Sequence, residues 1–218
     1  GLPPLFCQTK HFDLKKMALT VTDTNENFDT WISKEFVPQD LRDSLSNAAI
    51  MMVPFENLRE DTGPLFPTGT EELFRYFKEN LPKEIQIDIC IADEDYQEFA
   101  FYNDYKRLGH FIITAIAVPV FVGILSPYIY DNYIKHDESK PQIQIIDNST
   151  KNIDNSTHTT INNHISTLAD KKYLEPTHIK FSITIVNDTL GTAKNISYEG
   201  PAANIDSVLK VLKEYEQQ

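Results

Sequence analysis

The chain has 218 residues, of which 41% are hydrophobic and 24% are charged, a composition that excludes a wholly disordered protein. Its formal net charge of -12 at pH 7 disfavours contact with phosphate backbones, so we expect no nucleic-acid partner. The two cysteines, Cys7 and Cys90, are too few for a disulfide framework or a cysteine-bound metal cluster.

The first half of the chain predicts a small α/β domain over residues 17–108, preceded by a flexible arm or expression remnant over residues 1–16. Residues 48–53 form an apolar run of the length expected for a buried strand. A helical pattern over residues 68–81 follows, and residues 85–92 predict a second strand. A connection this long predicts a parallel strand pair with a right-handed crossover.

Acidic side chains follow both of these predicted strands. Glu56 comes after the first strand, and Asp93 and Asp95 come after the second. Ligands of parallel sheets bind at the carboxyl ends of strands, and carboxylate oxygens suit magnesium. The alternative interpretation is a solvated acidic surface or the start of a helix. The sequence thus offers Glu56, Asp93 and Asp95 as candidate ligand or metal ligands, with Mg²⁺ as the one cofactor considered and no catalytic residue assigned.

An uncharged segment in the middle of the chain predicts a single transmembrane helix over residues 109–130, reached through a helix over residues 96–108. The run from Phe111 to Tyr130 has no charged residue, and at about 1.5 Å per residue it crosses roughly 30 Å of hydrocarbon. The helix breakers Pro119, Gly123 and Pro127 are tolerated in membrane helices, where they are expected to form a hinge. The alternative is a pair of buried strands that turns at Pro119 inside a soluble core.

The sidedness of this predicted helix follows from the segment that precedes it. Basic residues are balanced on its two flanks, so their count does not orient it. A folded segment without a recognisable signal peptide precedes it, which predicts a single-pass protein with its N-terminal domain in the cytoplasm.

The second half of the chain predicts a polar connection and a small terminal unit. Residues 131–172 are rich in Asn and Thr and predict a linker or a strand-like segment. Residues 173–218 predict a β-β-α module, with strands over 178–186 and 195–199 and a helix near the C-terminus. Such a unit buries too little apolar surface to be stable alone, so we expect it to associate with copies of the chain or with a protein partner.

The functional hypothesis is a membrane-anchored, non-catalytic sensor or effector. Its α/β domain receives a ligand or partner, and the kinked helix transmits or executes the response; the lipid bilayer and further copies of the chain are the expected partners. The build is similar to that of small bacterial defence or stress effectors, an analogy of architecture alone. The alternatives are a membrane-anchored, magnesium-dependent enzyme that uses the acidic cluster, and a structural assembly subunit.

Overall fold

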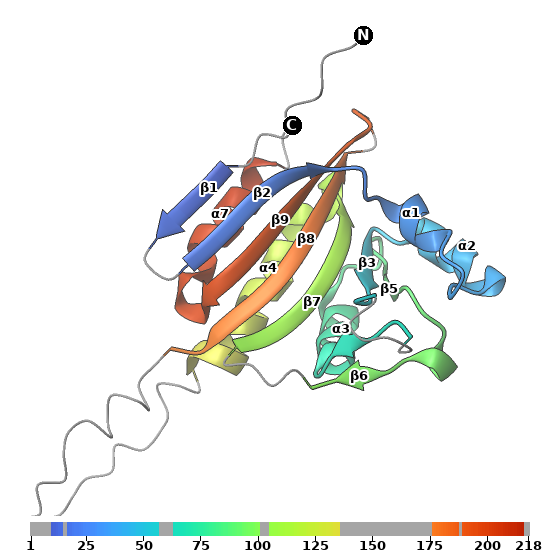
Figure 1. The fold of residues 1–218 in the computed structure, drawn as a ribbon, viewed down its shortest axis with the longest axis horizontal. Coiled ribbons are helices and arrows are strands. Elements are labelled where there is room, and N and C mark those ends of the chain that lie inside the picture. The colour runs from blue at the N-terminus through green and yellow to red at the C-terminus, as the bar shows by residue number, and fades with distance from the viewer. Residues whose placement is uncertain are drawn as a thin grey trace, which may run out of the picture.

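The computed structural model describes residues 10–14, 17–56, 63–100, 105–135, 176–187 and 189–215. These residues form a mixed α/β fold around a seven-stranded sheet with the strand order β1-β2-β9-β8-β7-β3-β5 (Figure 1). A second sheet has two short strands, β4 and β6. The strands are β1 Lys10–Leu14, β2 Met17–Thr24, β3 Ile50–Val53, β4 Phe66–Pro67, β5 Ile87–Ile89, β6 Glu98–Phe99, β7 Tyr105–Thr114, β8 His178–Asn187 and β9 Thr192–Pro201.

Helices connect and cover these strands. The α-helices are α1 Phe28–Ile32, α2 Gln39–Asn47, α3 Thr70–Asn80, α4 Val118–Ile129 and α7 Ile205–Glu214. Three 3-10 helices are η1 Asp93–Asp95, η2 Ala115–Ala117 and η4 Ala202–Asn204, and η3 Tyr130–Ile134 is a π-helix.

The strand directions make the main sheet mixed, whereas the sequence predicted a parallel one. β3 and β5 are parallel and are joined through α3, so the predicted strand-helix-strand crossover is confirmed. β7 and β8 are also parallel, but β7 is antiparallel to β3, and β2, β9 and β8 alternate in direction. Strands from the two halves of the chain meet in the antiparallel pair β2–β9 and in the parallel pair β7–β8.

One face of the sheet packs against α3, α4 and α7, which lie behind the strands in Figure 1. The two rings that flank Phe121 of α4 are Phe77 of α3 and Phe111 of β7, at centroid distances of 5.2 Å and 5.1 Å. The ring of Phe181 of β8 lies 5.5 Å from that of Tyr198 of β9, tilted by 47°, in the same core. Burial of these large rings is the main apolar contribution to the fold.

The opposite face is covered only in part. α1 and α2 lie over β7 and β3, where their Trp31 and Leu45 join a second cluster with Met51 and Ile112. Among the described residues, no helix crosses the front of β2, β9 and β8 (Figure 1). The side chains there are polar, because alternate residues of a strand point to opposite faces. Neighbouring positions across the three strands are Thr20, Ser197 and Ser182.

The predicted transmembrane helix starts too early, and this is a correction. Residues 109–114 belong to β7, a strand whose Phe111, Ile112 and Ile113 are completely buried. These residues are apolar on both sides because the sheet is covered on both faces here, by α4 and by α1 and α2. An uncharged strand that is followed directly by an uncharged helix therefore has the sequence pattern of one long transmembrane helix.

The residues before this strand also differ from the prediction. In place of a helix over residues 96–108, the described residues form β6 and the first part of β7. The pairing of β7 with β8 shifts between Arg107 and Gly109, where Gly109 has φ of 111°. A β-bulge of this kind interrupts the alternation of polar and apolar residues, and glycine adopts the left-handed conformation without steric cost.

The helical segment that follows β7 has the length and apolarity of a membrane helix but is partly buried in the molecule. η2, α4 and η3 form a continuous segment, Ala115–Ile134, that is long and apolar enough to cross a membrane by length and composition alone. The core helix of a soluble protein meets the same criterion. In the most apolar part of this segment, 44% is buried inside the molecule. Its outward side carries Ile116, which is 79% exposed, and Tyr130, which is 49% exposed.

The terminal β-β-α module forms as predicted, from β8, β9 and α7. Its hairpin is not isolated, because β8 pairs with β7 and β9 pairs with β2. The apolar surface that a unit of this size lacks is thus supplied by the same chain, and self-association stays a prediction. The polar connection predicted over residues 131–172 lies outside the described residues from position 136 onward, as do residues 1–9, 15 and 16 of the predicted arm.

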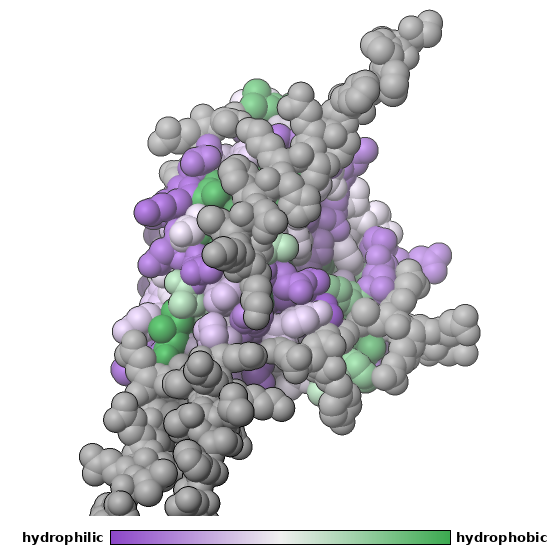
Figure 2. Space-filling view, turned by 60° about the vertical axis from the view of Figure 1, so that its left-hand side comes forward, coloured by the Kyte–Doolittle hydropathy of each residue, from purple (hydrophilic) through white to green (hydrophobic). Residues whose placement is uncertain are grey.

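The described residues on one face of the molecule form a mainly hydrophilic surface (Figure 2). Figure 2 shows hydrophobic colour only in small, separate patches on the face that it presents. This agrees with the charged composition of the chain.

Candidate functional site

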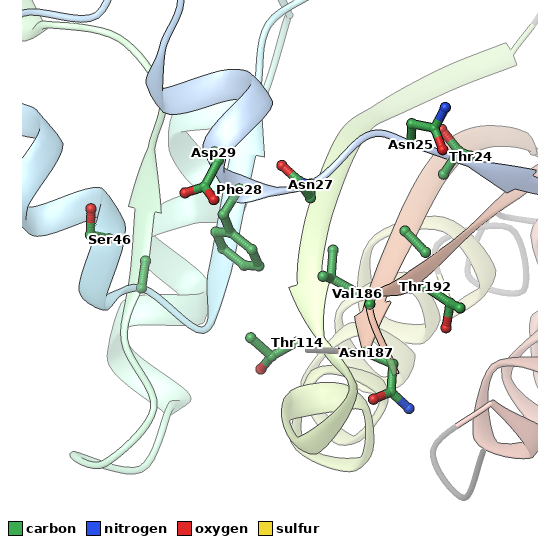
Figure 3. A pocket seen from close by; sticks show the side chains of 13 residues that line it. Thr24, Asn25, Asn27, Phe28, Asp29, Ser46, Thr114, Val186, Asn187 and Thr192 are labelled. Atoms are coloured by element: carbon green, nitrogen blue, oxygen red, sulfur yellow. The ribbon is translucent and has the colours of Figure 1, made fainter. Parts of the chain in front are cut away.

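Three strands of the main sheet end side by side and form the floor of a cleft. β7 and β8 are parallel, and β2 runs in the same direction as β8 because both are antiparallel to β9. Their last residues, Thr24, Thr114 and Asn187, therefore meet at one end of the sheet. The loop after β2 and the turn between β8 and β9 complete a cavity of about 470 Å³, which we call the strand-end cleft (Figure 3). This volume lies in the range of small-molecule sites, roughly 300–1,000 Å³.

Among the described residues, the lining of the strand-end cleft is uncharged except for one carboxylate. Its polar side chains are amides and hydroxyls, together with the carboxylate of Asp29, and Phe28 supplies an aromatic ring. Figure 3 shows this ring between the α1–α2 side and the strand side of the cleft. The complete lining is Thr24, Asn25, Asn27, Phe28, Asp29, Ser46, Ala48, Thr114, Val186, Asn187, Gly191, Thr192 and Ala193.

Asn27 fixes the conformation of the loop that closes one side of the cleft. It is the N-cap of α1, where its Oδ1 accepts a hydrogen bond of 2.9 Å from the backbone N–H of Thr30. The Thr30 hydroxyl accepts from the backbone N–H of Asn27 at 3.0 Å, which completes a reciprocal capping box. The five-residue helix α1 and its Phe28 are positioned by this cap.

Glu26 attaches the same loop to the sheet. Its Oε2 accepts a hydrogen bond of 2.9 Å from the hydroxyl of Thr184, a completely buried residue of β8. The same oxygen lies 3.3 Å from Nε2 of His110 on β7. Its Oε1 accepts a hydrogen bond of 2.8 Å from Nε1 of Trp31 on α1. One carboxylate thus ties together two central strands and the helix beside the cleft.

The electrostatics of Glu26 follow from this position. Burial alone raises the pKa of its carboxyl, but the hydrogen bond and charge of His110 and the hydrogen bonds from Thr184 and Trp31 outweigh burial, and the pKa is lower than its ordinary value. Glu26 is therefore an ionised anchor at neutral pH. Asn195 of β9 extends the network, because its Nδ2 donates to Thr184 at 3.0 Å.

The residues predicted as a metal site are not brought together. Glu56 pairs with Lys34 at 2.9 Å, while Asp93 and Asp95 lie in η1. No group of three or more His, Cys, Asp or Glu side chains among the described residues is arranged to hold a metal ion. β5 ends at Ile89, and Asp93 and Asp95 follow it in η1, after three intervening residues.

Asp93 instead lines a second, larger cavity of about 760 Å³ beside the edge strand β5, between α2 and α3. Charges of both signs surround it, including Arg75 and Lys78 on α3 and Asp88 on β5. Glu56 and Asp95 do not line it. This cavity lacks the anchored loop that shapes the strand-end cleft, so we place the candidate site at the strand ends.

The three residues predicted as a hinge all lie on α4. Pro119 occupies the first turn, where proline costs no internal hydrogen bond. Gly123 is exposed, and a side chain added there would meet open space. Pro127 is inside the helix and exposed, and the π-helix η3 follows three residues later. The helix breakers thus lie toward solvent, while the opposite side of α4 is buried.

Sequence reasoning missed the strand-end cleft because its residues carry no motif. The polar stretch Asn25-Glu26-Asn27 directly after the strand-like run of β2 was the available signal. The other side of the cleft comes from residues about 160 positions later, and only the pairing of β2 with β9 brings them together.

The comparisons with known proteins give no further constraint. Neither the family models, nor the curated proteins, nor the solved structures contain a match to this chain.

Proposed function

We propose that this chain is a non-catalytic receptor domain in which the strand-end cleft receives a small molecule and the junction between β7 and α4 relays its presence. The observation that carries the proposal is the position of Thr114. This residue lines the cleft, ends β7, and is followed directly by η2 and α4. Contact with a ligand at Thr114 acts on the first residues of the most apolar helix of the molecule.

The packing of α4 supports a role in passing a ligand-induced shift to other helices, in preference to a purely structural role. α4 contacts both α3 and α7, so a small shift at its N-terminus reaches two further helices. Its inward residues Val118, Phe121 and Leu125 are completely buried, while Ile116 stands in solvent. Close-packed interiors transmit displacement because they do not deform continuously.

Ligand binding in the strand-end cleft is tested with a variant that fills the cleft. Thr192 is exposed at its rim, so Thr192→Phe is expected to fold and to block ligand entry. The matched control is Thr189→Phe, in the same turn but outside the lining. Thermal unfolding is measured against neutral sugars, amino acids and nucleotides. A ligand that raises Tm of the natural chain and of the control, but not of the blocked variant, identifies the cleft as the site.

Hydrogen exchange then measures the relay itself. With the identified ligand bound, we expect slower exchange of the backbone amides in η2 and the first turn of α4, and no change in the blocked variant. Protection confined to the cleft-lining loop, with η2 and α4 unaffected, would contradict the relay while leaving a binding site.

A second function is favoured by one observation, the length and apolar character of Ala115–Ile134. In this arrangement the segment anchors the chain in a bilayer as a single pass, with the N-terminal domain in the cytoplasm and copies of the chain as neighbours. Its outward residues Ile116, Gly123 and Pro127 carry no charge. Sedimentation of the intact chain with membranes, resistant to high-pH washing, would support this function, and recovery in the supernatant without detergent would reject it.

A further inference from the structure

The chemistry of the strand-end cleft restricts the charge of its ligand. Of the described residues that line it, none is Lys, Arg or His, so an anionic group finds no cationic partner there. Asp29 is the one carboxylate among the described lining residues, and one exposed carboxylate binds an organic cation weakly. Amide and hydroxyl groups instead suit a ligand that is polar and neutral.

Two asparagines of the lining present their amide nitrogens as donors. Oδ1 of Asn27 accepts from the backbone N–H of Thr30, and Oδ1 of Asn187 accepts from the backbone N–H groups of Thr189 and Leu190 at 3.1 Å and 3.2 Å. These bonds fix the orientation of each side-chain amide, because the oxygen must face the backbone donors. The remaining Nδ2 groups donate to a ligand, and the carboxylate of Asp29 accepts from one.

Phe28 adds a flat apolar surface to these polar groups. It is the first residue of α1, half-buried, and its ring faces the side of the cleft formed by Thr114 and Val186 (Figure 3). The face of an aromatic ring carries partial negative charge and attracts polarised C–H groups. A saturated ring that bears hydroxyls offers both a C–H face and alternating hydroxyl donors and acceptors.

We infer that the strand-end cleft binds a neutral, hydroxyl-rich ring of monosaccharide size, with its C–H face on Phe28 and its hydroxyls on Asn27, Asp29 and Asn187. This inference rests on the proposed receptor function and adds the class of ligand. The same ring chemistry occurs in free sugars and in the end residues of glycan chains. Both sources are included in the test.

The single tryptophan of the chain makes binding measurable. Trp31 lies three residues after Phe28 and hydrogen-bonds to Glu26 of the cleft loop, so its fluorescence reports on the loop. The full chain is titrated with glucose, galactose, N-acetylglucosamine and an N-acetylglucosamine oligomer, and with glucose 6-phosphate as the charged counterpart. Calorimetry on the same samples gives the stoichiometry. We expect one site per chain, and binding of glucose 6-phosphate at least tenfold weaker than that of the best neutral sugar.

Three variants assign the contacts. Phe28→Leu keeps apolar bulk and removes the flat ring, so we expect about three- to tenfold weaker binding. Asp29→Asn removes a charged acceptor from an exposed position, with about tenfold weaker binding expected. Thr189→Phe, outside the cleft, should leave the affinity unchanged. Equal melting temperatures of the variants, measured first, separate lost binding from lost folding.

The outcomes distinguish this inference from the function on which it rests. Tighter binding of the oligomer than of the monomer identifies a glycan end as the source, and equal binding identifies a free sugar. If phosphorylated sugars, nucleotides or amino acids bind in the cleft and neutral sugars do not, the ligand class is wrong and the receptor function stands. If no compound binds in a manner sensitive to Thr192→Phe, both are wrong.

Discussion

A single carboxylate holds the candidate site of this molecule in place. Glu26 lies between Asn25 and Asn27, both of which line the strand-end cleft, while its own side chain turns to the sheet and meets His110 and Thr184. A half-buried, ionised group with several donors depends on each of these donors. The shape of the cleft therefore depends on a residue that does not line it.

Replacement of Glu26 by Gln tests this dependence. We expect a loss of about 1–3 kcal/mol in the free energy of unfolding at pH 7, because Thr184 and His110 lose their charged acceptor. The pKa of Glu26 is lowered on folding, so its stabilisation is present above the ordinary value of 4.5 and is lost as pH falls through the folded-state pKa. Urea unfolding between pH 3 and pH 7 measures both effects.

Glu35→Gln is the matched control, since it removes the same charge from an exposed position. The natural chain and this control should lose stability in acid with similar slopes, and Glu26→Gln should show a shallower slope. An unchanged slope in the Glu26 variant would mean that the carboxylate is not ionised in its network.

At the scale of the elements, the helical segment Ala115–Ile134 combines two surfaces that a sequence does not separate. On its buried side, Phe121 of α4 packs between Phe77 and Phe111, and on its outward side Ile116 of η2 and Tyr130 of η3 are exposed. Packing in the hydrophobic core uses only the buried side of this segment. A bilayer would contact residues all around the helix.

A pair of substitutions separates these two environments. Phe121→Ala leaves a cavity between α4, α3 and β7 and should cost about 3–5 kcal/mol of unfolding free energy. Ile116→Ser, at an exposed position before α4, should change it by no more than about 0.5 kcal/mol. Chemical denaturation without detergent gives both values. Similar, small effects at both positions would contradict the packing of α4 in the core.

Local patterns predicted several elements well. The apolar run of β3, the stripe of α3 and the alternation in β8 each identify their element, because periodicity reflects which side of an element is buried. The sequence pattern assigns residues 109–114 of β7 to the transmembrane helix, with buried strands only as the alternative, because β7 is buried on both faces and runs into α4 without a charged residue. The strand-end cleft was missed because its parts come from distant segments, which periodicity does not relate.

At the scale of the whole molecule, the two predicted soluble units share one sheet. β2 and β7 come from the first half of the chain, and β8 and β9 from the second half pair with both of them. A single sheet with a common core unfolds as a unit when no segment is stable by itself. The β-β-α module is therefore expected to have no separate transition.

Unfolding followed by two signals tests this cooperativity. The fluorescence of Trp31 reports on the region of α1, and far-ultraviolet circular dichroism reports on the whole fold. We expect one urea midpoint for both signals. Leu212 is completely buried in α7, and Leu212→Ala should lower the free energy of unfolding by about 2–5 kcal/mol. Both urea midpoints should therefore fall by the same amount. A variant that shifts only the dichroism midpoint would indicate two independently stable units.

The order of the strands has a consequence for the growing polypeptide. Residues 111–134 leave the ribosome before β8, β9 and α7, which supply much of their covering in the finished molecule. During that interval the most apolar stretch of the protein has only its earlier neighbours to pack against. Until residues 178–215 have been synthesised, this apolar helix is therefore expected to remain open to aggregation.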